Sequence, residues 1–402
     1  MSEERKSIYL INPLSHIYEL DDMLEFCNKH ERIYIYGKGE AQEMLLKFFD
    51  MCQVNIYAYV KSFPEETDNH FIYRKAKVEY IDDVLKDNGA GIIVAIPDRY
   101  YDSIIPKFRE NNFDSFFVMT ENNKKSIACL MKPRCREEMQ FEISLVDHCN
   151  LSCQMCDHYS QLSNEWFVDK TSFKNDIEQM GKIFDHRLGL ITLLGGEPTL
   201  HPDLNELMEI TRHEFPDTEI IVLTNGIKLL DLEKSEKGNF WQVAKDNNIH
   251  ITVTVYPIKF DYIALEKKAK EYGVSLVHSS NIHANQFTQK PKISDKHTFD
   301  LSKSVPRAHC LHCLYFNKFT TLKDGKFYMC PVQAHIDIFN KCFGKNLEYT
   351  EGDYLDIYKV KDWHELAEFS STWSPFCSYC DQQKWGHDSV WKASSKKIEE
   401  YV

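Results

Sequence analysis

Short apolar runs alternate with amphipathic segments through the first third of the chain. Four of these runs have the length and composition of buried strands, and they cover residues 32–36, 54–60, 91–96 and 115–119. The segments 41–49 and 101–111 carry apolar residues at helical spacing. Because strands that alternate with helices usually pair in parallel, the pattern predicts a small α/β domain over residues 1–130.

The alternation resumes after residue 136 and continues to about residue 300. Five strands are predicted, at residues 141–146, 190–194, 219–224, 250–256 and 275–278. The helices predicted to follow them cover residues 172–184, 203–215, 240–247 and 262–272. At least five β/α units in a row favour a barrel, in which polar residues at the strand ends are site candidates. These candidates are Asn225, Thr252 and Thr254, with Lys259, His278 and Ser279 behind them; for each, a solvated or strand-capping role is an equal alternative.

Two segments break the alternation. Residues 121–140, which contain Pro133 and several lysines and arginines, are predicted to be a linker. Residues 301–402 show little periodicity apart from a β-hairpin, in which residues 317–322 and 326–329 flank the turn Lys323-Asp324-Gly325. The sequence therefore predicts three domains, over residues 1–130, 136–300 and 301–402.

The first predicted strand ends in the turn Gly37-Lys38-Gly39, as in a Rossmann-like domain. A dinucleotide site would need glycine or alanine where the chain has Gln42, and an acidic residue where the second strand ends in Lys61-Ser62. The turn could instead receive another anion at the helix N-terminus, or only shape a docking domain. We therefore expect a Rossmann-like sheet and do not favour NAD as its ligand.

The composition narrows the class of protein. Of the 402 residues, 43% are hydrophobic and 27% charged, as in ordinary soluble proteins. The net charge of −13 disfavours nucleic-acid binding, and no apolar run approaches the ~20 residues of a membrane span. The N-terminus lacks the regions of a signal peptide. We therefore expect a cytoplasmic protein whose thirteen cysteines serve metal or redox chemistry.

Cys149, Cys153 and Cys156 lie in one loop directly after the predicted strand 141–146. Iron–sulfur clusters and structural zinc sites normally take four protein ligands, so three cysteines leave one coordination position open. An open position indicates chemistry at the metal. The alternative is a zinc knuckle that His148 or His158 completes.

A second motif follows the next predicted strand, where residues 190–194 run into Gly195-Gly196-Glu197-Pro198. Paired glycines let backbone approach a ligand closely, and a carboxylate accepts hydrogen bonds from an ammonium group. Together the two motifs resemble those of radical S-adenosylmethionine (SAM) enzymes. The resemblance implies a partial (β/α)6 barrel, a [4Fe–4S] cluster on the three cysteines, and SAM chelated to the open iron with its methionine amino group held by Gly-Gly-Glu-Pro.

Six cysteines lie within residues 301–402: Cys310, Cys313, Cys330, Cys342, Cys377 and Cys380. A cysteine before a hairpin, one at its end and a closing Cys-x-x-Cys pair resemble the SPASM and twitch extensions of radical SAM enzymes. The resemblance implies one auxiliary [4Fe–4S] cluster on Cys313, Cys330, Cys377 and Cys380, with Cys310 able to replace Cys313. Cys342 would be spare, or a thiol that donates a hydrogen atom to a substrate radical. The alternative is a zinc ribbon, because paired Cys-x-x-Cys motifs also bind zinc.

The same resemblance implies the chemistry. SAM would be cleaved reductively, with an electron from a donor such as flavodoxin or ferredoxin, and a 5′-deoxyadenosyl radical would abstract a hydrogen atom from the substrate. Asn225 would then meet SAM or substrate, and Thr252 and Thr254 the ribose. Dehydrogenation would follow if the auxiliary cluster took a second electron, and epimerisation if a thiol returned a hydrogen atom, so we expect an oxidoreductase or an epimerase.

The expected substrate is a small polar molecule, namely a sugar, an amino-sugar or a nucleotide-linked sugar. This expectation rests on the first domain, which resembles small Rossmann-like domains attached to enzymes of bacterial surface-sugar biosynthesis, and on similar twitch-bearing enzymes that act on aminocyclitols and sugars. Two alternatives stay open. One is modification of a ribosomally made peptide, and the other is a non-catalytic, zinc-stabilised scaffold that has kept the fold.

Overall fold

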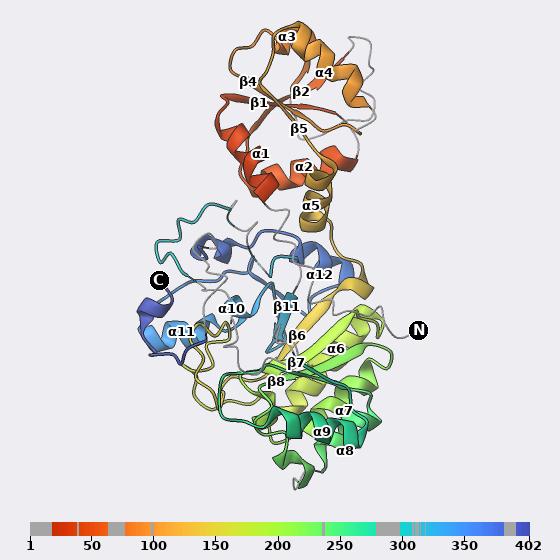
Figure 1. The fold of residues 1–402 in the computed structure, drawn as a ribbon, viewed down its shortest axis with the longest axis vertical. Helices are drawn as coiled ribbons and strands as arrows, with labels where there is room; N and C mark the ends of the chain where they lie inside the picture. Colours follow the sequence, from red (N-terminus) through yellow and green to blue (C-terminus); the bar gives the residue numbers. More distant parts are fainter. Residues whose placement is uncertain are drawn as a thin grey trace. The chain divides into compact units, whose positions relative to one another are not determined.

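The chain divides into two compact units in the computed structural model, residues 1–132 with 306–312 and residues 133–305 with 313–402 (Figure 1). The structure describes residues 18–37, 40–62, 77–97, 100–234, 238–278, 298–307, 309, 313, 315–317, 319–381 and 391–402. None of the helices in these ranges combines the length and the apolar run needed to cross a bilayer.

The first unit is built on a five-stranded parallel sheet of order β3-β2-β1-β4-β5. Its strands are β1 (Arg32–Tyr36), β2 (Ile56–Lys61), β3 (Lys77–Tyr80), β4 (Ala90–Val94) and β5 (Phe116–Val118). Its helices are α1 (Tyr18–Asn28), α2 (Glu40–Met51), α3 (Ile81–Val84), α4 (Tyr101–Glu110) and α5 (Glu121–Met131). The predicted Rossmann-like fold is confirmed, and the short edge strand β3 is an addition that its polar sequence did not reveal.

The predicted linker over residues 121–140 is wrong in its first half, because Glu121–Met131 form helix α5. Thr120 caps this helix: its hydroxyl accepts from the N–H of Asn123 (3.1 Å), and the Asn123 side chain accepts from the N–H of Thr120 (2.9 Å). Such a capping box satisfies backbone donors that a helix start would otherwise leave unpaired. Of the two lysines within this helix, Lys125 is exposed, whereas the ammonium group of Lys124 lies over the ring of Tyr101, 5.3 Å from its centroid.

Gly37 ends β1 with a φ of +138°, and a Cβ there would lie 2.3 Å from the carbonyl oxygen of Ala95. The N–H of Ala95 in turn donates to the carbonyl of Tyr36 (2.8 Å). Glycine is therefore needed at this position for the close approach of two strand ends, independent of any ligand. Lys38 and Gly39 lie outside the described residues.

The second unit contains an eight-stranded sheet of order β10-β9-β8-β7-β6-β11-β12-β13. Its strands are β6 (Gln140–Val146), β7 (Leu190–Gly195), β8 (Glu219–Thr224), β9 (His250–Val253), β10 (Leu276–His278), β11 (Phe319–Lys323), β12 (Lys326–Tyr328) and β13 (Tyr354–Asp356). Strands β6 to β10 pair in parallel in chain order, as the predicted β/α units require. Residues 279–297, which follow β10, lie outside the described part of the chain, so the sixth unit of the expected barrel stays a prediction.

The helices of this unit are α6 (Lys170–Phe184), α7 (Leu204–Glu214), α8 (Phe240–Asp246), α9 (Tyr262–Tyr272), α10 (Pro331–Ala334), α11 (Ile336–Phe343) and α12 (Trp363–Ser370). Short 3-10 turns cover Arg136–Glu138, Pro198–Leu200, Asp231–Lys234, Pro375–Tyr379 and Ile398–Glu400. The last of these is a single turn at the charged end of the chain.

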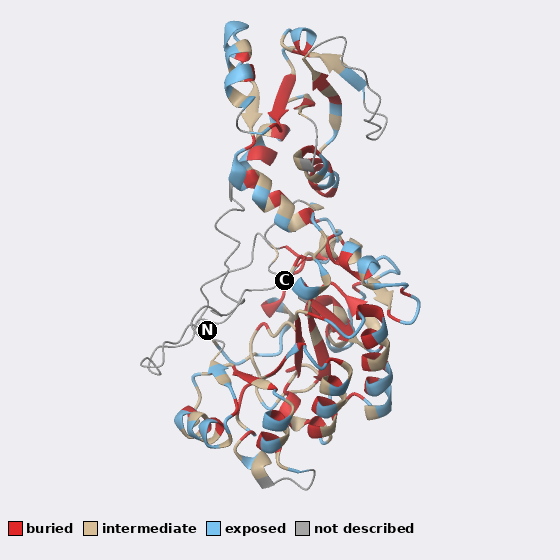
Figure 2. Cartoon of the chain, turned by 90° about the vertical axis from the view of Figure 1, so that its right-hand side faces the viewer, coloured by how far each residue is buried: buried red, intermediate tan, exposed pale blue. Residues whose placement is uncertain are grey.

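One face of the larger sheet forms the main hydrophobic core. Alternate residues of the strands pack there against α6 to α9, among them Phe141 and Ile143 of β6, Ile191 of β7 and Val222 of β8. Figure 2 shows these strands as largely buried. The residues between them face the other side of the sheet, where polar groups such as Ser144 collect. Because side chains alternate between the two faces along each strand, the sheet face covered by the helices is apolar and the opposite, inner face is polar.

The C-terminal hairpin joins this same sheet. Strand β11 pairs in parallel with β6 and antiparallel with β12, and the turn residues Asp324 and Gly325 have φ values of 50° and 68°. These are the left-handed values that an Asp-Gly hairpin turn takes, so the predicted hairpin is confirmed. The predicted boundary between the second and third domains, at residue 300, therefore falls between strands of one continuous sheet. The division of this unit into two domains stays a prediction.

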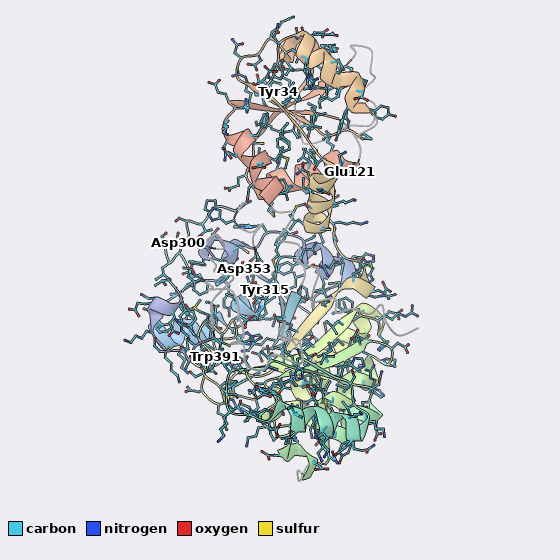
Figure 3. All side chains as sticks on the ribbon, in the orientation of Figure 1. Tyr34, Glu121, Asp300, Tyr315, Asp353 and Trp391 are labelled. Atoms are coloured by element: carbon cyan, nitrogen blue, oxygen red, sulfur yellow. The ribbon has the colours of Figure 1, made fainter. Side chains whose placement is uncertain are left out.

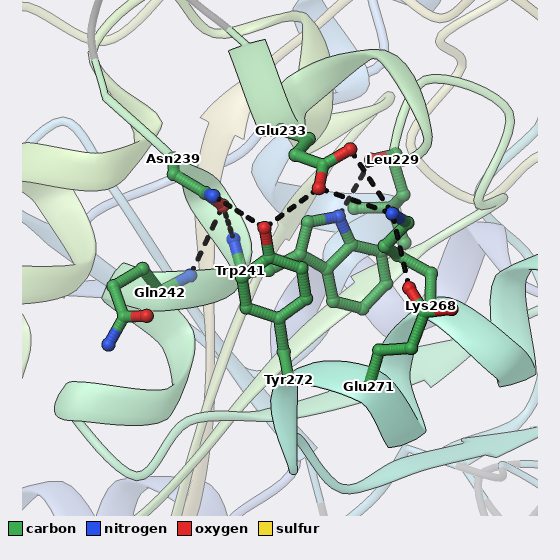
Figure 4. A network of polar contacts seen from close by, with 8 residues as sticks. All are labelled: Leu229, Glu233, Asn239, Trp241, Gln242, Lys268, Glu271 and Tyr272. Atoms are coloured by element: carbon green, nitrogen blue, oxygen red, sulfur yellow. Dashed lines mark hydrogen bonds and ion pairs between the residues drawn. The ribbon is translucent and has the colours of Figure 1, made fainter.

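A polar network fixes the connection that follows β8 (Figure 4). Glu233 accepts from Lys268 (3.1 Å) and from the hydroxyl of Tyr272 (2.8 Å), both on α9. Asn239 donates to the same Tyr272 hydroxyl (2.8 Å), and the indole of Trp241 donates to a backbone carbonyl of the connection. The network holds this connection against α9. The connection begins at the end of β8, where Asn225 lies.

Candidate active site

The loop after β6 encloses a cavity of about 210 Å³. Its described lining residues come from the cysteine loop and from the ends of two further strands: Cys149, Leu151, Cys153, Gln154, Met155, Cys156, Asp157, Ser160, Gln161, Gly196 and Tyr256. The three cysteines therefore meet at one cavity, at the carboxyl ends of the parallel strands. This is the edge where the strand pattern predicted the site.

The three thiols form one donor set. Burial raises the pKa of Cys149, and its neighbours Cys156 and Cys153 raise it further; burial likewise raises the pKa of Cys156 to about 12. A bound cation would favour the thiolate forms of the three cysteines. Metal binding would therefore release the protons of these thiols. Three soft sulfur donors around one cavity fit an iron–sulfur cluster with an open position.

The zinc knuckle considered above needs a histidine as fourth ligand. The Nδ1 of His148 accepts from the backbone N–H of Trp166 (3.3 Å), and the Nδ1 of His158 is bonded to Asp157 (2.7 Å). Both rings are thus engaged in packing the loop. Cys156, Asp157 and His158 do place their ligand atoms within 4.8 Å of one another, but this grouping contains only one of the three cysteines.

The two glycines after β7 are explained by packing against the root of the cysteine loop. Gly195 has a φ of +147°, and a Cβ there would lie 2.3 Å from the carbonyl oxygen of Val146. A Cβ on Gly196 would lie 2.0 Å from the carbonyl oxygen of His148. The N–H of Gly196 donates to Val146 (2.5 Å), and that of Glu197 donates to His148 (3.1 Å). The motif therefore positions the cysteine loop, and Gly196 also lines the cavity.

Gly196→Ala is expected to disrupt the site because its Cβ would meet backbone that no side-chain rotation can move. Overpacking of this kind costs about 1–3 kcal/mol, and here it would push the cysteine loop outward. We expect iron bound after anaerobic reconstitution to fall by about half, to the content of one cluster. Gly352→Ala is the matched control, because the nearest atoms to its added Cβ lie at 3.5 Å; wild-type iron content in Gly196→Ala would contradict the packing argument.

Glu197 is 1% exposed, and its carboxylate joins two strand ends. Oε1 accepts from the Thr199 hydroxyl (2.5 Å) and the Thr224 hydroxyl (2.6 Å), while Oε2 accepts from the backbone N–H of Asn225 (2.9 Å). Burial raises the pKa of Glu197, and these hydrogen bonds oppose the rise. Because Oε2 has one protein donor, it keeps acceptor capacity for a ligand ammonium group, as the resemblance implies. Pro198 begins the 3-10 turn that presents Thr199.

Of the strand-end candidates, the structure brings Asn225 to the cysteine loop. Its amide donates to the side chain of Asn150 (2.7 Å) and lies 3.8 Å from the sulfur of Cys149. Thr252 is buried with a hydroxyl that has no partner within the described ranges, and neither it nor Thr254 is part of the cavity lining. The Nε2 of His278 is hydrogen-bonded to Glu266 of α9 (2.6 Å), so this side chain points toward the helices that cover the sheet. Ser279 lies outside the described residues.

Several lining residues were missed from the sequence. Ser160 and Gln161 are 4% and 5% exposed, and each has a buried oxygen without a partner among the described residues. Tyr256 follows β9, and Trp391, labelled in Figure 3, packs edge-on against it with ring centroids 5.9 Å apart. Ser160 and Gln161 could have been identified from their nearness to Cys156 in the sequence. Trp391 lies too far along the chain for any local signal to have connected it with Tyr256.

A buried ion pair ties the root of the cysteine loop to the C-terminal hairpin. Lys323 of β11 donates to Asp147 at 2.6 Å, and their side chains are 10% and 11% exposed. Burial lowers the pKa of the neighbouring His335 well below its usual value, with Lys323 adding to the effect, so this ring is neutral. Its Nδ1 donates to the carbonyl of Pro331 (2.9 Å), and its Nε2 is then the acceptor for the hydroxyl of Ser144 (3.1 Å).

Glu142 lies deeper on the same inner face, opposite Thr321 in the β6–β11 register. Its Oε2 is inaccessible and has no partner in the described part of the chain. Burial raises its pKa to about 7, with His158 lowering and Asp157 raising it. The folded chain therefore holds a proton that the unfolded chain loses above its ordinary pKa near 4.5.

Because of this retained proton, stability should fall as pH rises from about 4.5 to about 7, by on the order of 2–3 kcal/mol. Glu142→Gln removes the titration and should flatten this part of the profile. Urea unfolding at half-unit pH steps measures it, with the exposed Glu209→Gln as control. A wild-type slope in Glu142→Gln would show that another group is responsible.

The C-terminal cysteines gather in a second place. Cys330 is half-buried at the end of the hairpin, where its partial burial raises its pKa and Cys313 and Cys377 add to the rise. Burial likewise raises the pKa of Cys380, and Cys377, Cys330 and Cys313 add to it. The four cysteines favoured from the sequence thus lie near one another. Cys310 lies outside the described residues. Cys342 is exposed on the last turn of α11 and is not part of the described cavity lining.

Comparison with known proteins agrees with the two motifs. The family model described as Radical SAM superfamily matches residues 143–305. The chain is similar to GTP 3′,8-cyclase of Aquifex aeolicus, with 35% identity over 280 residues, 60% of this chain and 76% of that protein. It is also similar to GTP 3′,8-cyclase 1 of Mycobacterium tuberculosis, with 28% identity over 279 residues, 65% of this chain and 75% of that protein.

Among solved structures, BtrN in complex with AdoMet and 2-DOIA matches with a TM-score of 0.37 and 17% identity. The match covers 65% of this chain and 96% of BtrN. At this score the likeness says nothing about the substrate of the chain.

Proposed function

The chain belongs to the radical SAM superfamily, and from that premise we propose that it abstracts a hydrogen atom from a small polar substrate carrying a sugar or sugar-like ring. As a member of this family it uses a [4Fe–4S] cluster and SAM. The observation that carries the proposal is the convergence of Cys149, Cys153 and Cys156 on one cavity beside the Gly-Gly-Glu-Pro segment. A cluster held by Cys149, Cys153 and Cys156, with SAM bound to it, would supply the electron for reductive cleavage of SAM and thereby the chemistry of hydrogen-atom abstraction.

We assign the chain's own groups as follows. Cys149, Cys153 and Cys156 would hold the cluster, and the free acceptor position of Glu197 would receive the SAM ammonium group. Ser160 and Gln161, with buried unpaired oxygens at the cavity, would bind hydroxyl or amino groups of SAM or substrate. Burial of these groups excludes water, which protects a carbon radical from side reactions.

A second cluster at Cys313, Cys330, Cys377 and Cys380 would accept an electron from the substrate radical. Its support is the mutual proximity of these four thiols. With an oxidising partner present, the favoured outcome is dehydrogenation by an oxidoreductase. Epimerisation would instead need a hydrogen-atom donor at the substrate, and Cys342 is on an exposed helix face.

The described cavity lining favours an uncharged or cationic substrate. It contains the carboxylate of Asp157 and neither lysine nor arginine. A triphosphate is usually bound by cationic side chains or by metal ions that bridge its oxygens. GTP is nevertheless a second candidate, because both curated relatives reported above are named GTP 3′,8-cyclase.

The test is release of 5′-deoxyadenosine by the anaerobically reconstituted, reduced protein with SAM and one candidate substrate at a time. The panel contains nucleotide-linked sugars, amino-sugars and aminocyclitols, with GTP as a separate arm. Substrate-dependent release with a sugar, together with a product two mass units lighter, supports sugar dehydrogenation. Release with GTP alone would replace the sugar by a nucleotide, and failure to cleave SAM at all would restore the non-catalytic scaffold.

A further inference from the structure

The last segment of the chain, residues 391–402, pairs with the cysteine loop through its backbone. Cys153 and Ala393 form an isolated antiparallel β-bridge. The hydrogen bonds of this bridge join the residues on either side of it: the N–H of Gln154 donates to the carbonyl of Lys392 (2.9 Å), and the N–H of Ser394 donates to the carbonyl of Ser152 (2.8 Å). The main chain around the middle cysteine is therefore held by a partner from the far end of the chain.

A buried carboxylate fixes the shape of this segment. Glu400 is 7% exposed, and its two oxygens accept from the hydroxyls of Ser394 and Ser395, each at 2.6 Å. The N–H of Ser395 donates to the same carboxylate (2.5 Å). Because the 3-10 turn Ile398–Glu400 brings the carboxylate back to these serines, the bridge to Cys153 and the final residues of the chain are tied together.

Tyr401, the next residue, makes connections in two directions. It is 1% exposed, and its ring centroid lies 5.8 Å from that of Tyr159 in the cysteine loop. The side-chain amide of Gln161, also in this loop, donates to its hydroxyl. The carbonyl of Tyr401 accepts from the N–H of Phe299 (2.6 Å). The side chain of Tyr401 therefore contacts the cysteine loop, while its backbone holds residues 298–300.

Residues 298–300 lead on to the C-terminal cysteines. Phe299 forms an isolated antiparallel β-bridge with Cys380. Two hydrogen bonds flank this bridge, from the N–H of Asp381 to the carbonyl of Thr298 (2.9 Å) and from the N–H of Asp300 to the carbonyl of Tyr379 (2.8 Å). The rings of Phe299 and Tyr401 also pack on Phe339 of α11, with centroids 5.2 Å and 5.5 Å from it. Backbone hydrogen bonds and buried rings thus connect Cys153 to Cys380 through the end of the chain.

We propose that residues 391–402 are a positioning segment that couples two cysteine sites, so that metal bound at the second site strengthens the binding of the cluster at the first. The first site is the cysteine loop, and the second consists of Cys313, Cys330, Cys377 and Cys380. This inference rests on the proposed function, which assigns a cluster to each site.

The physical basis of the coupling is the effect of a metal on the residues that hold it. Metal binding stabilises the folded arrangement of its ligands, so ligation would restrain the backbone around Cys380. That backbone is hydrogen-bonded to the segment of Phe299, which holds Tyr401 and with it the partner of Cys153. Because coupling between two binding sites is reciprocal, the cluster in the cysteine loop should strengthen metal binding at the second site by the same factor.

The test compares four forms of the full chain, each reconstituted without oxygen: the wild type, Cys377→Ala with Cys380→Ala, Glu400→Ala, and all three substitutions together. The cluster of the cysteine loop is the reduced cluster whose electron paramagnetic resonance signal changes when SAM is added. The measured quantity is the concentration of an iron chelator that removes half of this signal. Loss of the second site and Glu400→Ala should each lower this concentration about tenfold. The combination should lower it no further than Glu400→Ala alone, because no coupling is left to lose.

Glu399→Ala is the matched control, because Glu399 is exposed and precedes Glu400 directly. Glu400→Gln should recover most of the wild-type resistance to the chelator, since its amide oxygen can still accept from the serines. Hydrogen exchange at the Gln154 amide, measured without metal, shows whether a variant has released the segment. If Glu400→Ala does not release it or does not fold, Ser394→Pro decides in its place, because proline lacks the N–H that donates to the cysteine loop.

Wild-type resistance to the chelator after removal of the second site would overturn the inference and leave the proposed function intact. An undiminished effect of the second site in a variant whose segment is released would overturn it as well. A wild type that takes up iron but shows no signal responsive to SAM would count against the proposed function instead.

Discussion

Replacing Cys149, Cys153 and Cys156 together by alanine is expected to lower the iron content from about eight to about four per chain and to abolish 5′-deoxyadenosine release. The reason is that the three thiols line one cavity and no other cysteine contributes to its described lining. Iron, sulfide and zinc are measured per chain after anaerobic reconstitution, together with the visible spectrum. The remaining iron would be that of the cluster at Cys313, Cys330, Cys377 and Cys380.

The matched control is Cys129→Ala with Cys135→Ala, two exposed cysteines at other places in the chain. It should keep both clusters and the wild-type activity. About four irons with one zinc in the wild type would leave the radical enzyme but remove the auxiliary electron acceptor, and redox-neutral chemistry would then be favoured. Eight irons in the triple variant would contradict the assignment of the three cysteines.

Lys323→Met is expected to destabilise the second unit by about 3–5 kcal/mol, because it leaves the carboxylate of Asp147 buried without its cation. Its second effect is local: Asp147 directly precedes the cysteine loop, so cluster binding should weaken as well. The double variant Asp147→Asn with Lys323→Met removes both charges, and it should recover most of the lost stability.

Urea unfolding followed by tryptophan fluorescence measures this change selectively. All six tryptophans lie after residue 133, so their emission reports the second unit alone. Lys174→Met serves as control, because its ion pair with Glu178 is exposed and long (3.7 Å) and should contribute well under 1 kcal/mol. An equal effect of the two lysine substitutions would show that the buried pair does not join the hairpin to the loop.

The strand–helix alternation was sufficient to predict both sheets, because buried parallel strands read as apolar runs and amphipathic helices keep their period. It failed where local signals were weak. The edge strand β3 has a polar sequence, and α5 begins with the polar run of residues 121–126. The short helices α10 and α11 pack on the C-terminal cysteine region, and α12 packs on the main core. A window of a few residues does not record such tertiary contacts.

The candidate site shows the same division. Cys149, Cys153, Cys156 and the glycines after β7 could be predicted because each motif lies in one short stretch. The partners of these residues could not be predicted from the sequence. The pairing of Lys323 with Asp147 and the β-bridge between Cys153 and Ala393 join residues distant in the chain, and they exist only once β11 has added to β6 and the last segment has docked. The glycine pair also has a role that its motif did not indicate, since its missing Cβ atoms make room for backbone.

The docking of residues 391–402 on the cysteine loop has a consequence for how the protein matures. More than two hundred residues separate Cys156 from Trp391, so on the ribosome the loop emerges about 10–50 s before the segment that completes its surroundings. During that interval the backbone of Cys153 and Gln154 lacks the partner that residues 392 and 393 later provide. A cluster that is loaded before the chain is finished would therefore meet a loop without this support, whereas one loaded after folding would meet the supported loop.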